Sequence, residues 1–228
     1  MTRYPTVLFD LDGTLIDSIR LILESYHHTL RTHGFPPRTD EHWLAGVGTP
    51  LRSQFADWSH DADLLEAMVA TYRDYNLAHH DRMVTVYPGV GDMLARLREA
   101  SLNLALVTSK NRQGALRGLH LTGLADYFEV LVCVDDVQHP KPHPEPVERA
   151  LALLGADRRD AVFIGDSIHD MHAGRAAGVA TAAALWGPFG REHLEPTAPD
   201  HWLTTPHEVV ELVGIAGGGE GSAGLASA

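Results

Sequence analysis

Two aspartate motifs constrain the fold of this chain more than any other feature of its sequence. The first, residues 10–14 (DLDGT), follows the apolar run 7–9, and the second, residues 165–170 (GDSIHD), follows the apolar run 161–164. Short apolar runs of this kind are typical of buried strands in a parallel sheet. Open α/β folds bind ligands at the carboxyl edge of such a sheet. We therefore expect four aspartates to meet at one sheet edge, where a cation such as Mg²⁺ must offset their repulsion.

The rest of the chain alternates strand-like and helical patterns. Apolar runs predict strands at 6–10, 103–108, 129–134, 161–165 and 179–185. Apolar side chains at helical spacing predict helices at 91–100, 112–121 and 145–154. Strands and helices that alternate in this way indicate an α/β fold, with a Rossmann-like doubly wound parallel sheet covered by helices on both faces.

The segment between the first strand and the turn at 87–89 breaks this alternation. It shows no convincing strand, and its apolar residues recur at helical spacing. We expect one helix that is N-capped by Ser18 and stopped by Gly34, and a short helix that is capped by Thr39. Such a block between two elements of a sheet is typical of an inserted domain.

These patterns divide the chain into three parts. Residues 1–16 and 87–216 are predicted to form the Rossmann-like core, and residues 17–86 an inserted α-helical cap. Both connections of the cap leave the sheet near the first aspartate motif, so the cap should cover the carboxylates and exclude water. The Gly-, Ser- and Ala-rich tail 217–228 is predicted to be disordered.

Composition and charge narrow the classes of function. The net charge of −12 argues against nucleic acid or an anionic membrane as the main partner, but a small anion beside a bound metal stays possible. No run approaches the roughly 20 apolar residues of a membrane span, and the N-terminus has no signal-peptide pattern. The single cysteine, Cys133, excludes an intrachain disulfide. We expect a cytoplasmic protein, either monomer or homodimer, that acts on a small phosphorylated metabolite.

The aspartates suit the hydrolysis of a phosphate ester. Asp10 ends its strand and can attack phosphorus, which would give an aspartyl-phosphate. Asp12 can reach the same region as general acid and then general base, after which Gly13 permits a turn. Mg²⁺ can bridge a carboxylate and a phosphate, and Asp166 is the natural further ligand.

Two other segments can supply phosphate contacts. Residues 108–110 (TSK) follow the strand-like run 103–108, and a hydroxyl with backbone N–H groups there can hold phosphate oxygens. Lys141 lies in a proline-rich segment, and Lys110 and Lys141 are the only lysines of the chain. Their positions indicate that both offset the charge of the aspartates.

In this order, the motifs around Asp10, Thr108, Lys141 and Asp166 resemble the four motifs of the haloacid dehalogenase-like (HAD) hydrolase superfamily. The resemblance spans about residues 6–190 and includes a small helical cap after the first motif. It implies that Asp10 is the nucleophile, Asp12 the acid/base, Thr108 a phosphate ligand and Lys141 the clamp on nucleophile and phosphate. It also implies a metal site that comprises Asp10, the Asp12 carbonyl and Asp166, with Asp170 as an accessory acid.

Within that superfamily the residues favour a phosphatase. Haloacid dehalogenases lack the second aspartate of the first motif, so Asp12 argues for phosphoryl transfer. The runs 12–18 and 46–51 are most similar to phosphoglycolate phosphatases and their pyrophosphatase relatives, which commonly have Asn or Thr where Ser109 stands. Arg52 can meet a carboxylate or distal phosphate of the substrate. The remaining residues expected to bind substrate are Gly13, Thr14, Ser109 and Lys110.

Three alternatives stay open. An inorganic pyrophosphatase would use the same motifs. β-Phosphoglucomutases are similar to this chain, but they carry a histidine about where Ile22 stands. A receiver-like signalling module or a non-catalytic binding protein is the remote alternative, since neither needs an acid/base Asp12 or a lid.

Overall fold

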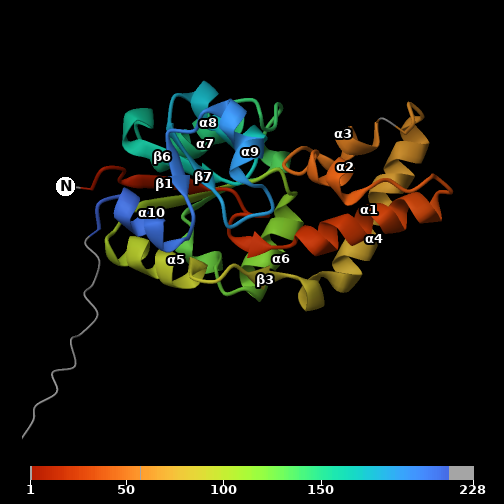
Figure 1. The fold of residues 1–228 in the computed structure, drawn as a ribbon, viewed down its shortest axis with the longest axis horizontal. Helices are drawn as coiled ribbons and strands as arrows, with labels where there is room; N and C mark the ends of the chain where they lie inside the picture. The colour runs from red at the N-terminus through yellow and green to blue at the C-terminus, as the bar shows by residue number, and fades with distance from the viewer. Residues whose placement is uncertain (1, 57, 216–228) are drawn as a thin grey trace, which may run out of the picture.

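The computed structural model describes residues 2–56 and 58–215, so the tail 217–228 lies outside the described residues. Its centre is a six-stranded sheet in the order β5-β4-β1-β6-β7-β8, with every neighbouring pair parallel (Figure 1). The strands are β1 (Thr6–Phe9), β4 (Asn103–Val107), β5 (Val130–Val132), β6 (Ala161–Gly165), β7 (Ala180–Ala184) and β8 (His201–Leu203).

Helices cover both faces of this sheet because successive strand residues point to opposite sides. Val7 and Phe9 of β1 pack in one apolar cluster, whereas Leu8 packs in another. The helices of the first cluster are α5 (Val90–Glu99), α6 (Arg112–Leu121) and α10 (His207–Leu212), and those of the second are α7 (Glu145–Leu154) and α8 (Ile168–Ala177). The predicted fold class, a doubly wound parallel α/β sheet, is confirmed.

All five predicted strands are present, with ends that differ by no more than two residues from those expected. Strand β8 was missed, because a three-residue segment, His-Trp-Leu, carries no readable period. The shorter remaining elements are α9 (Arg191–Leu194) and the 3₁₀ turns η1 (Ala125–Tyr127), η2 (Val134–Asp136), η3 (Arg158–Asp160) and η4 (Glu195–Thr197).

The segment after β1 forms a group of helices that extends beyond the end of the sheet (Figure 1). These helices are α1 (Ile19–Thr32), α2 (Asp40–Leu44), α3 (Leu51–Phe55) and α4 (Ala62–Met83). An aromatic centre holds them together: the ring of Tyr26 stacks on Trp43 at 4.2 Å, and Phe55 packs edge-on against both. The inserted segment therefore has apolar packing of its own.

A short antiparallel pair joins the two connections of this helical segment. Strand β2 (Ile16–Asp17) pairs with β3 (Thr85–Val86), so the expectation of no strand here was wrong. Two-residue strands give no periodic signal, and this pair forms only because folding brings distant residues together.

The expected helix ends are mostly found. Thr39 caps α2 by accepting a hydrogen bond from the His42 N–H, and α1 ends just before Gly34, whose φ of +73° favours glycine. Ser18 stands at the N-cap position of α1 but makes no capping bond, because its hydroxyl donates to Asp12 instead.

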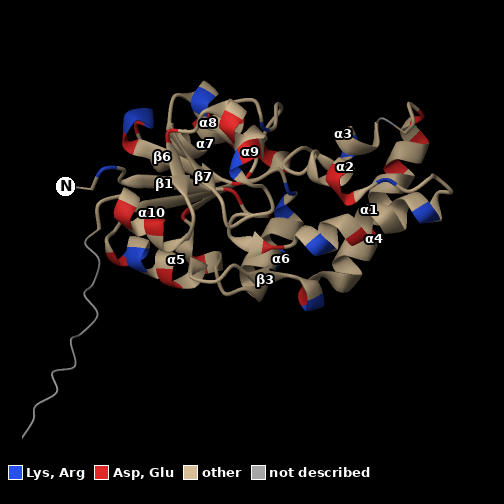
Figure 2. Cartoon of the chain, viewed as in Figure 1, with Lys and Arg blue, Asp and Glu red and all other residues tan. Residues whose placement is uncertain are grey.

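Acidic and basic residues are interspersed over the visible side of the molecule (Figure 2). Among the helices that the structure describes, none combines the length and the apolar composition needed to cross a bilayer.

Candidate active site

Three aspartates meet at the carboxyl edge of the sheet. Asp10 directly follows β1, while Asp166 follows β6 and Asp170 lies in the first turn of α8. One carboxylate oxygen from each lies within 4.8 Å of the others, and all three residues are buried. Parallel pairing of β1 with β6 brings the two motifs together, as their positions after strands predicted.

Lys141 neutralises part of the negative charge of this cluster. Its Nζ donates to Asp10 Oδ1 at 2.7 Å, to Asp170 Oδ1 at 2.6 Å and to the Val107 carbonyl at 3.2 Å. Burial by itself would lower the pKa of Lys141, but Asp10 and Asp170 raise it above its usual value, so the ammonium form is kept. Burial raises the pKa of Asp10 to about 7, against the opposing charge of Lys141.

Asp166 has the features of a metal ligand. Its Oδ1 accepts a 2.7 Å hydrogen bond from Thr14 Oγ1, whereas its buried Oδ2 has no partner among the described residues. Gly13, at φ +89°, leaves room for it, because a Cβ there would lie 2.3 Å from Asp166 Oδ2. A buried carboxylate oxygen without a donor is costly unless a cation binds it. This donor set of hard oxygens fits Mg²⁺.

Asp170 is more fully occupied than Asp166. Besides Lys141, it accepts from the Ser167 backbone N–H at 3.0 Å and from Ser167 Oγ at 2.6 Å. The first of these bonds and the one from the Asp170 N–H to Ser167 Oγ form a capping box at the start of α8. Its two oxygens are thus already bonded. This arrangement suits the accessory role that the family resemblance implies for Asp170.

Asp12 does not join the carboxylate cluster through its side chain. Lys110 Nζ contacts both of its oxygens, at 2.8 and 3.0 Å, and Ser18 Oγ donates to Oδ1 at 2.5 Å. Lys110 therefore offsets the charge of Asp12, just as Lys141 offsets that of Asp10. The expectation that four aspartates meet was wrong for Asp12, because its side chain is not part of the aspartate group that could hold a metal.

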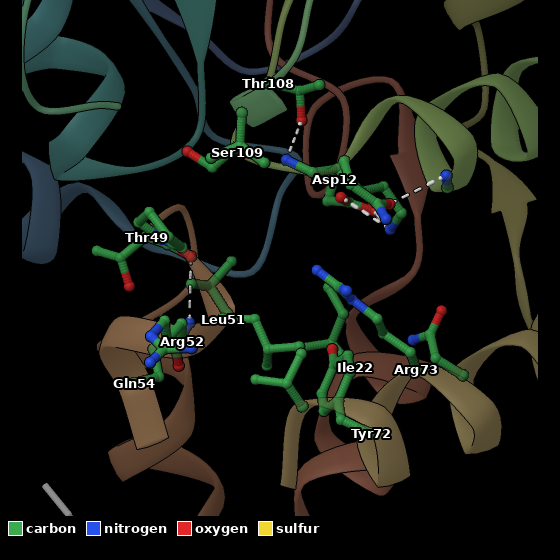
Figure 3. Close-up of a pocket in the computed structure, with 18 of the residues that line it drawn as sticks. Asp12, Ile22, Thr49, Leu51, Arg52, Gln54, Tyr72, Arg73, Thr108 and Ser109 are labelled. Atoms are coloured by element: carbon green, nitrogen blue, oxygen red, sulfur yellow. Dashed lines mark hydrogen bonds and ion pairs between the residues drawn. The ribbon is translucent and has the colours of Figure 1, made fainter. Parts of the chain in front are cut away.

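A cavity of about 330 Å³ opens above these residues, between the sheet edge and the inserted helices. Asp12, Thr108 and Ser109 line its core side, and Ile22, Leu51 and Tyr72 line its helical side (Figure 3). Asp10 also reaches it, and Lys110 and Arg52 belong to its lining as well. The volume lies within the range of small-molecule sites.

Some expected substrate contacts have other partners in this structure. Gly13 and Thr14 lie behind Asp166 and do not line the cavity. Ser109 lines it, but its hydroxyl donates to the Gly48 carbonyl of the inserted segment at 2.6 Å. Arg52 forms an ion pair with Glu66. Thr108 is buried beside the cavity, and its hydroxyl accepts from the Lys110 N–H at 3.1 Å.

The sequence reasoning did not single out Arg73 and Asn76, which also line the cavity. They follow Val69 on α4 at positions i+4 and i+7, so the three residues lie on the same face of the helix. A signal was present, since these polar residues lie beside Val69 and Tyr72, two of the residues at helical spacing in the inserted segment. It went unread because a polar residue on a helix is usually solvated.

Comparison with known proteins decides the family. The model of the family described as haloacid dehalogenase-like hydrolase matches residues 7–184. The chain belongs to the haloacid dehalogenase-like hydrolase family. It is 43% identical to "Pyrophosphatase PpaX" of Anoxybacillus flavithermus over 211 residues, which is 92% of this chain and 97% of that one.

Solved structures of HAD-like proteins share the whole fold. A provisionally named haloacid dehalogenase-like hydrolase from Bacteroides fragilis has a TM-score of 0.85 at 27% identity, covering 90% of this chain and 99% of that one. A provisionally named phosphoglycolate phosphatase from Lactobacillus plantarum has a TM-score of 0.82 at 27% identity, covering 93% and 100%. The resemblance inferred from the four motifs is confirmed.

Proposed function

We propose that this HAD-like hydrolase is a Mg²⁺-dependent phosphatase that acts on a small phosphorylated metabolite through an aspartyl-phosphate on Asp10. One observation carries the proposal: Lys141 bridges Asp10 and Asp170 beside Asp166, whose buried Oδ2 has no partner among the described residues. Most buried polar atoms of a structural cluster have a hydrogen-bond partner. A nucleophile that lines a cavity, with a cation and an unsatisfied ligand beside it, supplies parts that phosphoryl transfer needs.

The chemistry follows from the placement of the side chains. A carboxylate oxygen of Asp10 forms a bond to phosphorus while the bond to the leaving oxygen breaks, and Asp12 donates a proton to that oxygen. Water then attacks the phosphorus and gives its proton to Asp12, which releases phosphate and restores Asp10. Lys141 holds Asp10 in position throughout. For its acid/base role, Asp12 must begin the first step protonated and must exchange its contact with Lys110 for one with the reacting oxygens.

The metal site would comprise Asp10, Asp166 and the backbone carbonyl of Asp12, with Asp170 supporting Lys141. When bound there, Mg²⁺ neutralises phosphate charge and lets the anionic nucleophile approach. The helices α1–α4 would act as the cap: the Ser109–Gly48 hydrogen bond already joins them to the core above the cavity. A cap in this position keeps bulk water from the reacting atoms.

The candidate substrates are phosphoglycolate and inorganic pyrophosphate. Phosphoglycolate is favoured by the similarity of the residues around the first motif and by the name of the Lactobacillus plantarum protein. Pyrophosphate is favoured by the name of the relative that is 43% identical over nearly the whole chain. A β-phosphoglucomutase is less consistent with the site, because the apolar Ile22 lines the cavity where that reaction uses a histidine.

A phosphate-release assay with Mg²⁺ tests this function. The panel contains phosphoglycolate, pyrophosphate, nucleotides and sugar phosphates, and each is compared between the wild type and Asp10→Asn. We expect release from at least one small substrate and a loss on the order of 10⁴-fold in the variant, which lacks the nucleophile. Circular dichroism and a thermal melt check that the variant is folded. Activity retained by a folded Asp10→Asn protein would overturn the mechanism, and a stable phosphoprotein without phosphate release would favour a receiver-like module.

A further inference from the structure

The charged residues that line the cavity are all paired except one. Lys110 pairs with Asp12, Arg52 with Glu66, and Asp10 with Lys141 beneath the cavity floor. Arg73 also lines the cavity, yet it forms no ion pair or hydrogen bond with any other residue that the structure describes. Arg73 is therefore the one charged lining residue without an ion-pair partner among the described residues.

The position of Arg73 separates this charge from the reacting groups. Arg73 stands on α4, on the helical side of the cavity, whereas Asp12 and Thr108 lie on the opposite, core side (Figure 3). Ile22, Leu51 and Tyr72 lie on the same helical side as Arg73. A phosphoryl group placed at Asp10 would thus leave its leaving part to extend across the cavity toward the helical side and the guanidinium.

We propose that Arg73 binds a second anionic group on the leaving part of the substrate. The substrate class would then be phosphate esters or anhydrides that carry a carboxylate or a second phosphate. This inference rests on the proposed phosphatase function, and it names which side chain selects among phosphate compounds. The planar guanidinium suits both groups, since it can donate two parallel hydrogen bonds to a carboxylate or a phosphate.

Arg52 was the candidate for this role on sequence grounds, but its environment disfavours it. Its guanidinium already contacts the Glu66 carboxylate, and both side chains are more than half exposed, at 53% and 62%. An anion that approached Arg52 would have to displace Glu66 or lie beside its negative charge. Arg73 can bind an anion without breaking any ion pair of the described structure.

The test uses substrates with and without a second anionic group. One pair is phosphoglycolate and 2-hydroxyethyl phosphate, in which a hydroxymethyl group replaces the carboxylate. The other is pyrophosphate and acetyl phosphate, an anhydride in which an acetyl group replaces the second phosphoryl group. The variants are Arg73→Gln, Arg73→Glu and Arg73→Lys. Arg82→Gln is the matched control, because Arg82 is exposed in the last turn of the same helix and does not line the cavity.

We expect Arg73→Gln to lower kcat/KM for the member of the preferred pair that carries a second anionic group by roughly 10-fold, with a larger loss for Arg73→Glu. Arg73→Lys should lie between Arg73→Gln and the wild type, since it keeps the charge but not the planar fork. The members without a second anionic group should change by less than about twofold, as should every substrate in Arg82→Gln. Because Arg73 is exposed, added salt should also reduce the wild-type preference.

The outcomes separate this inference from the proposed function. Equal losses on both members of a pair, or no loss, would overturn the role of Arg73 while the phosphatase function stands. If the wild type releases phosphate from nothing in the panel, the function fails, and binding then decides the role of Arg73. In that case calorimetry with Mg²⁺ compares methylenediphosphonate with methylphosphonate. The role is supported if Arg73→Glu weakens the binding of the diphosphonate but not that of the monophosphonate. It is overturned if the variant binds both as the wild type does, or if the wild type binds neither.

Discussion

The charged side chains beneath the floor of the cavity and those of its helical wall differ in burial and in pairing. Beneath the floor, where Asp10 lines the cavity, Lys141 and Asp170 are 2% and 0% exposed and are joined by a 2.6 Å hydrogen bond. On the wall, Arg52 and Glu66 are 53% and 62% exposed, and Arg73 is exposed without a partner among the described residues. Buried charges must be held in one geometry, whereas exposed charges are screened by water. The buried charges beneath the floor are therefore suited to one fixed reaction. Substitutions in the helical wall can change which substrate binds at little cost in stability.

Replacing Lys141 should produce the largest effect and tests the floor directly. Lys141→Met leaves Asp10 and Asp170 buried without their cation, which should cost about 3–5 kcal/mol of unfolding free energy. Activity should be lost as well. Urea denaturation measures the cost, and adding Asp10→Asn and Asp170→Asn to the same protein should recover much of it. A cost below about 1 kcal/mol for Lys141→Met alone would show that the floor is as well solvated as the wall.

Replacing Asp166 should produce an intermediate effect and should stabilise the metal-free protein against unfolding. In Asp166→Asn an unpartnered buried oxygen loses its carboxylate charge, so the metal-free protein should gain about 1–3 kcal/mol of stability. The same change should remove the rise in melting temperature that Mg²⁺ gives the wild type. Thermal melts with EDTA and with Mg²⁺ measure both effects. If Mg²⁺ stabilises the variant and the wild type equally, the metal site does not include Asp166.

Replacing Arg52 should produce the smallest effect. Its ion pair with Glu66 is exposed, so Arg52→Gln should change the unfolding free energy by less than about 1 kcal/mol. We also expect kcat/KM to change by less than about threefold for both members of a substrate pair, in contrast to Arg73→Gln. Urea denaturation and the phosphate-release assay measure these quantities. A loss of kcat/KM only for the substrate with a second anionic group would show that Arg52, and not Arg73, selects this substrate.

Much of the core could be predicted from the sequence because its signals are local. The strands β1, β4, β5, β6 and β7 are apolar runs with readable boundaries, and Asp10 and Asp166 stand directly after β1 and β6. The meeting of Asp10 with Asp166 then follows from the parallel pairing of these two strands. The strands that were missed, β2, β3 and β8, are two or three residues long and pair with strands that are distant in the sequence.

The hydrogen-bond partners of single side chains could not be predicted from the sequence either. Ser18 has the residue type of an N-cap, but its hydroxyl goes to Asp12, and Ser109 directs its hydroxyl to Gly48 and not to the cavity centre. Thr14 likewise holds Asp166. A hydroxyl can satisfy many acceptors, so its residue type does not determine which acceptor it meets.

The sequence by itself determined the doubly wound fold, the set of acidic and lysine residues and the family to which the chain belongs. These follow from strand period and motif order, which act over a few residues at a time. Only the tertiary structure decided that Lys110 offsets Asp12, that Arg52 is paired with Glu66, and that Arg73 lines the cavity without an ion-pair partner among the described residues. Electrostatic pairing depends on distance in space. The pairing of β1 with β4 brings Asp12 and Lys110 together, and the packing of α3 and α4 places Arg52, Glu66 and Arg73.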